Sequence, residues 1–388
     1  YIDGEWVKAK GTTLGADDGI GVAAIMAVME DKTLKHGPIE ALITADEETG
    51  MFGAEGLPTN TLNSDVLLNL DSETWGKFVI GSAGGVDVTA DLEYKEVETD
   101  ANDAALQVTV KGLKGGHSGD DIDKKRANAI KILSRFLYMT QEKMDLRLVS
   151  FNSGKLHNAI PRDGKVVFAI PAAEKENVRA AWNVFAANVE DEFHVSDVEM
   201  EFYMQSTEAQ SVIEKECSVR IIRALQAVDN GVYSMCQDKA LETMVETSSN
   251  IAVVKTEENE IEVLASQRSN VMSNLDNECN TIQAVFQLAG AEVEQNDGYP
   301  AWKMKADSKL TKLAVDSYVK LFGKEPIVRG IHAGLECGLF SERYPNMDMV
   351  SFGPTLRFVH TPDEKLHIPT VQMVWDHLLD IMKNVPAK

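Results

Sequence analysis

Four short stretches of this 388-residue sequence combine carboxylates and histidines at positions that could do chemistry. The stretches are "GADDGIG" with Asp17 and Asp18, "ADEETG" with Asp46, Glu47 and Glu48, "NLDSE" with Asp71, and "RFVHTPDEKLHI" with His360. Divalent transition ions prefer imidazole nitrogen and carboxylate oxygen, and two ions about 3.5–4 Å apart need a carboxylate that bridges them. A further carboxylate that stays off the ions can accept a proton from water. Together the four stretches could supply a hydrolytic metal site.

Each stretch alone also has a simpler interpretation. Among 61 acidic residues, adjacent carboxylates often form a solvated face, and Glu47 and Glu48 could merely favour the start of a following helix. Asp17 and Asp18 suit a turn or a helix cap, and His360 alone could be structural. Asp71 differs, because an acid directly after "VLLNL" should be partly buried and should need a partner. The combination of all four favours the metal site.

The elements that must position these residues follow an α/β pattern. Residues 18–31 and 51–57 are predicted to be helices, and the apolar stretches 38–46 and 65–70 are predicted to be buried strands. Strands separated by helices predict a mostly parallel sheet with helices on both faces. Ligands bind at the carboxyl ends of such strands, where both predicted strands place their acids.

The pattern of apolar and polar residues changes after residue 84. Alternating strand patterns and an amphipathic helix over 121–139 predict an antiparallel α+β domain over 85–293. From residue 294 the α/β pattern returns, with a helix over 308–323 that ends at a glycine, a strand, and a closing helix. The sequence therefore predicts one split domain, residues 1–84 with 294–388, interrupted by an inserted domain.

Composition limits the partners. The formal net charge of −23 repels phosphate backbones and anionic lipid, so neither nucleic acid nor a membrane surface is an expected partner. Four scattered cysteines without a C-x-x-C pair are typical of reduced thiols in a cytoplasmic protein. Apolar runs are too short to span a bilayer.

Six motifs in order resemble those of the M20 metallopeptidases, and the likeness is greatest to their aminoacyl-histidine dipeptidase branch. They are "GTTLGADDGIG", "LITADEETGMFGAEGL", "NLDSE", "GLKGGHSGDDI", "GIHAGLECGLF" and "FGPTLRFVHTPDEKL". The resemblance implies two zinc ions, with manganese or cobalt as alternatives. Asp17 would bridge them, Glu48 and His360 would complete one site, Asp71 would serve the other, and Glu47 would be the general base.

The family also carries an H-x-D segment upstream of the "ADDG" motif, which supplies one more ligand. No such segment precedes Asp17 here, where the first histidine is His36. We therefore expect this chain to be the larger, carboxyl-terminal part of such an enzyme. The ion held by Asp17, Glu48 and His360 should then bind more tightly than the other.

The resemblance extends to the inserted domain, expected to be a lid through which the protein forms a homodimer. His117 in a glycine-rich loop would stabilise an oxyanion, and Asn158 and Arg268 would hold the substrate's carbonyl and carboxylate. In the last part of the chain, His332, Gly334 and Glu336 would contact the substrate, with Glu336 binding its free ammonium group. Each of these could instead be a loop or surface residue.

The expected activity is hydrolysis of dipeptides, Xaa-His and related short peptides. Two alternatives remain open at this point. One is another M20 amidohydrolase, an acylamino-acid deacylase that needs no free amine. The other is a catalytically impaired chain that only folds and dimerises.

Overall fold

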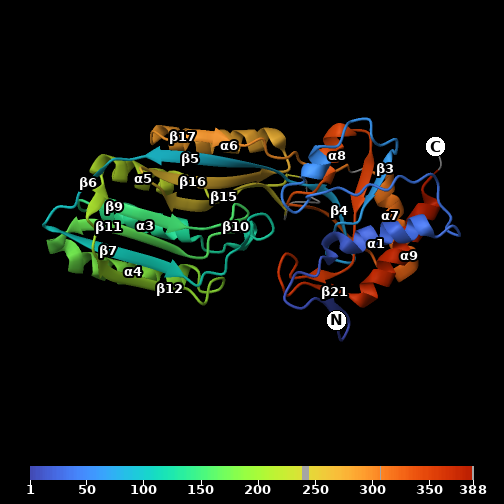
Figure 1. Ribbon diagram of the computed structural model, residues 1–388, viewed down its shortest axis with the longest axis horizontal. Helices are drawn as coiled ribbons and strands as arrows, with labels where there is room; N and C mark the ends of the chain where they lie inside the picture. Colours follow the sequence, from blue (N-terminus) through green and yellow to red (C-terminus); the bar gives the residue numbers. More distant parts are fainter. Residues whose placement is uncertain (238–243, 306, 387–388) are drawn as a thin grey trace. The chain divides into compact units, whose positions relative to one another are not determined.

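The computed structural model describes residues 1–237, 244–305 and 307–386. The chain divides into two compact units, one made of Tyr1–Ala83 and Pro300–Lys388, the other of Gly84–Tyr299. Figure 1 shows helices and strands mixed in both, which confirms the predicted α/β class with an α+β insertion. In the described part of the chain, no helix combines the length and the apolar character needed to cross a membrane.

Among its described residues, the first unit contains two small sheets and the helices packed on them. Its strands are β1 (Ile2–Asp3), β2 (Trp6–Lys8), β3 (Val66–Asn69), β4 (Lys77–Ser82), β18 (Ile327–Ile331), β19 (Asp348–Ser351), β20 (Leu356–Arg357) and β21 (Lys365–His367). Its helices are α1 (Ala16–Glu30), α2 (Phe52–Glu55), α7 (Lys309–Phe322), α8 (Cys337–Arg343) and α9 (Ile368–Asn384).

The central sheet of this unit has the strand order β18-β4-β19-β3. The outer pairs, β18 with β4 and β19 with β3, are parallel, whereas β19 and β4 are antiparallel. Side chains of these strands pack with α1, α7 and α9 around Phe78, Tyr318 and Phe352. The second sheet, β1-β2-β21-β20, is antiparallel and joins the first residues of the chain to the segment after His360.

The predicted strand over residues 38–46 is wrong. Those residues are described, but none of them is assigned to a strand. A strand forms only where its backbone groups pair with a neighbour, and the described order β18-β4-β19-β3 contains no partner for this segment. Ile43 is 57% exposed, as a residue of a buried strand would not be. The three acids Asp46–Glu48 therefore lie on a loop, which turns where the N–H groups of Gly50 and Met51 donate to the Glu47 carbonyl.

Among its described residues, the second unit is built on one large antiparallel sheet and two separate pairs of short strands. Its strands are β5 (Gly84–Glu93), β6 (Glu96–Glu98), β7 (Asp103–Lys111), β8 (Gly116–His117), β9 (Arg147–Ser153), β10 (Ala159–Ile160), β11 (Gly164–Pro171), β12 (Glu201–Thr207), β13 (Ser211–Ile213), β14 (Gly231–Met235), β15 (Val245–Thr256), β16 (Glu260–Ser269) and β17 (Glu292–Gln295). Its α-helices are α3 (Ala129–Gln141), α4 (Lys175–Glu192), α5 (Lys215–Ala227) and α6 (Met272–Leu288).

The large sheet runs in the order β12-β7-β11-β9-β15-β16-β5-β17, with β14 paired to β15. Strand residues alternate between a face packed on helices and a more open face. On β16, for example, Ile261, Val263 and Ala265 belong to the core, whereas Glu260 and Glu262 point the other way. Helices α3–α6 lie along this sheet (Figure 1), each in contact with its strands.

The helix predicted over 121–139 begins later than expected. Residues Ile122–Lys124 form a short 3₁₀ turn, and α3 begins at Ala129. The Asn128 side chain accepts hydrogen bonds from the N–H groups of Ile130 and Lys131, so it caps the helix at this point. The residues between β8, which ends at His117, and α3 therefore form a turn and a short connection, and His117 lies in a strand paired with β10 and not in the expected loop.

Candidate metal centre

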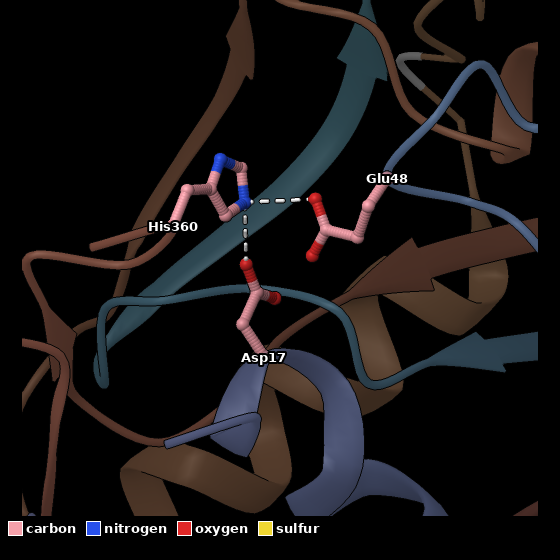
Figure 2. Close-up of side chains that lie close together, drawn as sticks. All are labelled: Asp17, Glu48 and His360. Carbon is pink, nitrogen blue, oxygen red and sulfur yellow. Dashed lines mark hydrogen bonds and ion pairs between the residues drawn. The ribbon is translucent and has the colours of Figure 1, made fainter. Parts of the chain in front are cut away.

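Asp17, Glu48 and His360 converge in the first unit (Figure 2). The Nε2 atom of His360 lies 2.8 Å from Oε2 of Glu48 and 3.1 Å from Oδ2 of Asp17. One ligand atom from each residue lies within 4.8 Å of the other two. The three residues come from the start of α1, the loop before α2, and the loop between β20 and β21, so only the folded chain brings them together.

Unusual backbone conformations aim these side chains. Gly15, directly before α1, has φ 70°, and Asp17 itself has non-helical angles inside the first turn. His360 has φ 61°, a left-handed conformation that costs energy for a residue with a Cβ. Such conformations are retained where the surrounding structure enforces them, often at functional sites.

The electrostatics of the cluster are those of acids crowded around one imidazole. Burial, and then the Asp17 carboxylate, raise the pKa of Glu48. Burial lowers the pKa of His360, but the Glu48 and Asp17 carboxylates outweigh it, so the net shift is upward. The two carboxylates attract the protonated imidazole, and they would attract a multivalent cation more strongly.

Asp71 lies beside this cluster at the end of β3. Burial raises its pKa well above the ordinary value, and the neighbouring Asp17 carboxylate, within hydrogen-bonding reach, raises it further. Its backbone N–H donates to Oδ1 of Asn69 at 3.2 Å, and Ser351 donates to the same oxygen at 2.6 Å. These bonds fix the backbone of Asp71 between the neighbouring strands β3 and β19, whereas the carboxylate itself contacts Asp17, another acid.

Glu47 and Asp18 lie close by, although neither belongs to the three-residue cluster. Burial, followed by repulsion from Glu48 and Glu336, raises the pKa of Glu47 to about 7. Burial also raises the pKa of Asp18 to about 7, although its carboxylate accepts a hydrogen bond from the Gly21 N–H at 3.0 Å. Asp46, by contrast, is exposed and has φ 56°.

The loop between β18 and α8 carries the predicted residues His332, Gly334 and Glu336. Glu336 is buried, accepts a hydrogen bond from Thr44 Oγ1 at 2.7 Å, and raises the pKa of both Glu47 and Asp18. It therefore lies at the edge of the acidic centre. His332 is also buried.

In the second unit, His117 is held in one tautomer. Its Nδ1 accepts hydrogen bonds from the N–H groups of Gly119 and Asp120, both at 3.2 Å. An acceptor nitrogen carries no proton, so the proton of the neutral ring is on Nε2. Burial, and then the charge of Arg268, lower the pKa of His117 to about 4, which keeps the ring neutral.

Asn158 and Arg268 lie near His117. The Asn158 carbonyl accepts a hydrogen bond from the Ser118 N–H at 2.8 Å, beside the pairing of His117 with Ala159. Arg268 is 5% exposed and donates to the Tyr299 hydroxyl at 2.6 Å. Among the described residues, no carboxylate forms an ion pair with Arg268, and its Nε has no hydrogen-bond partner. A buried guanidinium without an acid is suited to binding an anionic group.

Sequence reasoning missed several residues that support the cluster. Thr44 donates a hydrogen bond to the Glu336 carboxylate. The Asn69 side chain, itself bonded to Ser351, accepts a hydrogen bond from the backbone of Asp71. The Glu364 carboxylate accepts hydrogen bonds from backbone N–H groups before and at Asp17. The position of Glu364 in "HTPDE", so soon after His360, is the only signal in the sequence.

The donor set fits a divalent cation. Asp17 and Glu48 offer oxygen and His360 offers nitrogen, the ligand types that zinc and its neighbours prefer. The acids around them exceed the available bases, and their mutual repulsion is already apparent in the raised pKa values of Glu47 and Asp71. A cation held by the cluster would relieve that repulsion.

Comparisons with known proteins identify the relatives of this chain. A family model described as "Peptidase family M20/M25/M40" matches residues 3–384. The cytosol non-specific dipeptidase of Escherichia coli (strain K12) is 42% identical over 390 residues, which cover 100% of this chain and 80% of that protein. The crystal structure of aminoacylhistidine dipeptidase from Vibrio alginolyticus superposes with a TM-score of 0.89 at 45% identity, covering 100% of this chain and 79% of that one. The aminopeptidase PepT from Bacillus cereus shares the fold, with a TM-score of 0.51 at 16% identity.

Proposed function

Because this chain belongs to the M20/M25/M40 peptidase family, we propose that it hydrolyses dipeptides, Xaa-His and related short peptides, at a metal centre. The observation that carries the proposal is the convergence of Asp17, Glu48 and His360 from three separate parts of the chain. The names of the Escherichia coli and Vibrio alginolyticus relatives, both dipeptidases, support dipeptides as the substrate class.

The proposed centre takes two zinc ions, and manganese or cobalt would suit the same donors. Asp17 would be shared, Glu48 and His360 would complete one set of ligands, and Asp71 would belong to the other. The contact between the Asp17 and Asp71 carboxyl groups supports a shared role for Asp17. Bound zinc would supply a Lewis acid that polarises the scissile carbonyl.

Glu47 is the proposed general base. It would accept a proton from the attacking water and later deliver that proton to the leaving amine. Its place beside the cluster, but outside the three converging ligands, supports this role. A pKa near neutrality suits a group that must both accept and return a proton.

Three residues of the second unit and one loop of the first are proposed to bind the substrate. The neutral His117 would donate from Nε2 to the oxygen that gains charge as the carbonyl is attacked, and Asn158 would hold a carbonyl. Arg268 would bind the carboxylate of the dipeptide, which is supported by its burial without an acidic partner among the described residues. Glu336, with His332 and Gly334 on the same loop, would bind the free ammonium group.

We further propose a cytoplasmic homodimer formed through the second unit. Strand β14 exposes Val232, Tyr233 and Met235, and such apolar side chains on a sheet strand favour association. The name of the Escherichia coli relative, a cytosol dipeptidase, supports the compartment.

One experiment tests the activity and separates it from the deacylase alternative. The zinc-loaded protein is assayed with alanyl-histidine and with its N-acetylated form, with zinc content measured on the same sample. We expect hydrolysis of the free dipeptide and little of the acetylated one, because Glu336 should recognise a free amine. Preference for the acetylated form would indicate a deacylase. Zinc binding without hydrolysis of either would contradict the proposed activity.

A further inference from the structure

The carboxylate of Glu364 accepts hydrogen bonds from four consecutive backbone N–H groups at the start of α1. Oε2 accepts from Leu14 at 2.6 Å and Gly15 at 2.9 Å, and Oε1 accepts from Ala16 at 2.8 Å and Asp17 at 3.2 Å. Glu364 is 2% exposed, so water competes little for these bonds. The last of the four belongs to Asp17, one of the three converging residues of the metal centre.

These N–H groups depend on Glu364 because the helix provides little for them. The first N–H groups of any helix lack partners within it, and Gly15 has no side chain to cap α1. Asp17 and Asp18 also have non-helical angles, which interrupt the regular bonding of the first turn. A buried carboxylate at a helix N-terminus is favoured by the helix dipole, and its hydrogen bonds are charge-assisted. The backbone of Asp17 is thus held largely by Glu364.

The other end of this connection is His360. The turn between them is closed by Thr361, whose Oγ1 donates to the Phe358 carbonyl at 2.7 Å and accepts from the Asp363 N–H at 3.2 Å. The N–H of Glu364 itself donates to the Thr361 carbonyl at 3.1 Å. Glu364 therefore ends a short, internally bonded turn that contains His360, and its side chain ties that turn to Asp17.

We infer that Glu364 is a positioning residue that fixes Asp17 relative to His360 and so sets the affinity of the metal centre. The inference rests on the proposed function, since it takes these two residues as metal ligands. Groups that hold ligands in place typically change metal affinity about 10–100-fold when they are altered. Glu364 acts through the backbone of one ligand and the turn that carries another, because both of its carboxylate oxygens accept hydrogen bonds from backbone N–H groups.

The test compares zinc binding in the full chain and in the variants E364Q, E364D and E40Q. Glu40 is the matched control, because its carboxylate also accepts backbone N–H bonds, from Asn63 and Ser64, but holds no proposed ligand. Zinc affinity is measured by competition with a chelator, and the metal-free thermal midpoint is measured beside it. The absorption spectrum with Co2+ reports the ligand geometry independently of catalysis.

We expect E364Q to lower zinc affinity by about 10–100-fold and to alter the Co2+ spectrum, with E364D losing less because it keeps the charge. E40Q should change the thermal midpoint but leave zinc affinity within about twofold of the unchanged chain. A zinc affinity of E364Q within about twofold of the unchanged chain, or an equal loss of affinity in E40Q, would overturn the inference. If E364Q does not fold, the same criterion applies to E364D. An unchanged chain that binds no zinc would overturn the proposed function, and this inference with it.

Discussion

The imidazole Nε2 of His360 lies 2.8 Å from the carboxylate of Glu48, although the two residues are more than 300 positions apart in the sequence. Glu48 belongs to a loop in which the residues on either side of the acidic triplet, Ala45 and Thr49, are exposed. His360 belongs to a turn and has a left-handed backbone conformation. Neither residue lies in a helix or a strand. Their meeting point, shared with Asp17, is the best-defined chemical feature of the first unit.

Replacing His360 should remove zinc without unfolding the protein. H360A deletes the only nitrogen of the cluster, and we expect zinc affinity to fall by at least about tenfold, because the remaining carboxylates are poorer ligands for zinc. The measurement is zinc content after dialysis against a weak chelator. H367A is the control. His367 lies seven residues after His360, but it pairs with Glu5 and packs on Trp6. Equal zinc loss in H367A would contradict a specific role for His360.

The acidic triplet should divide into separate roles. E47Q is expected to lower kcat by about 10²–10⁴-fold, because the amide cannot accept a proton from water. D46N changes the adjacent exposed acid, and asparagine tolerates the left-handed φ of 56° found there, so kcat should stay within a fewfold of the unchanged enzyme. Both are measured with alanyl-histidine at equal zinc content. Similar losses in the two variants would show that charge alone, rather than proton transfer, matters at this loop.

The family and the fold class could be predicted from the sequence because both depend on patterns that are local. Glycines beside paired acids mark "GADDGIG", and period-2 alternation marks β7 and β11. The comparisons and the structure confirm both predictions. The grouping of Asp17, Glu48 and His360 was expected from the resemblance, and the structure brings these three together, while their metal ligation stays a prediction.

What could not be predicted depends on partners distant in the sequence. The apolar stretch 38–46 has the composition of a strand, but no described strand pairs with it. The start of α3 is set by the Asn128 cap, whereas the periodicity alone suggested an earlier start. Glu364 resembles any surface acid until its contact with residues 14–17 is known.

Arg268 should recognise the carboxylate end of the substrate. R268Q is expected to raise KM for alanyl-histidine by roughly 10–100-fold, the usual range for losing a charged hydrogen bond. Alanyl-histidine amide provides the matched test, because it lacks the carboxylate. The unchanged enzyme should discriminate strongly between the two substrates, and R268Q should barely do so. R223Q, which alters an exposed arginine paired with Glu142, should behave like the unchanged enzyme. Retained discrimination in R268Q would assign carboxylate recognition to another residue.

Glu278 should make the second unit less stable as pH rises from 4.5 to about 7. It is 0% exposed on the inner side of α6, and among the described residues neither carboxylate oxygen has a hydrogen-bond partner. Burial, followed by the charge of Asp229, raises its pKa to about 7 from an ordinary value of 4.5. The folded protein therefore holds this proton where the unfolded chain releases it. The stabilisation is complete below pH 4.5 and is lost as pH rises to about 7.

The variant E278Q keeps the shape of the side chain but cannot ionise. Ionisation at position 278 should therefore not lower its stability over this pH range. We expect the thermal midpoint of the unchanged protein, relative to that of E278Q, to decrease between pH 4.5 and pH 7 and to change little above it. E216Q, which alters an exposed acid on α5, is the control and should leave the pH dependence as it was. A midpoint difference between the unchanged protein and E278Q that stays constant with pH would mean that Glu278 is already ionised in the folded state, paired with a group or a water molecule that lowers its pKa.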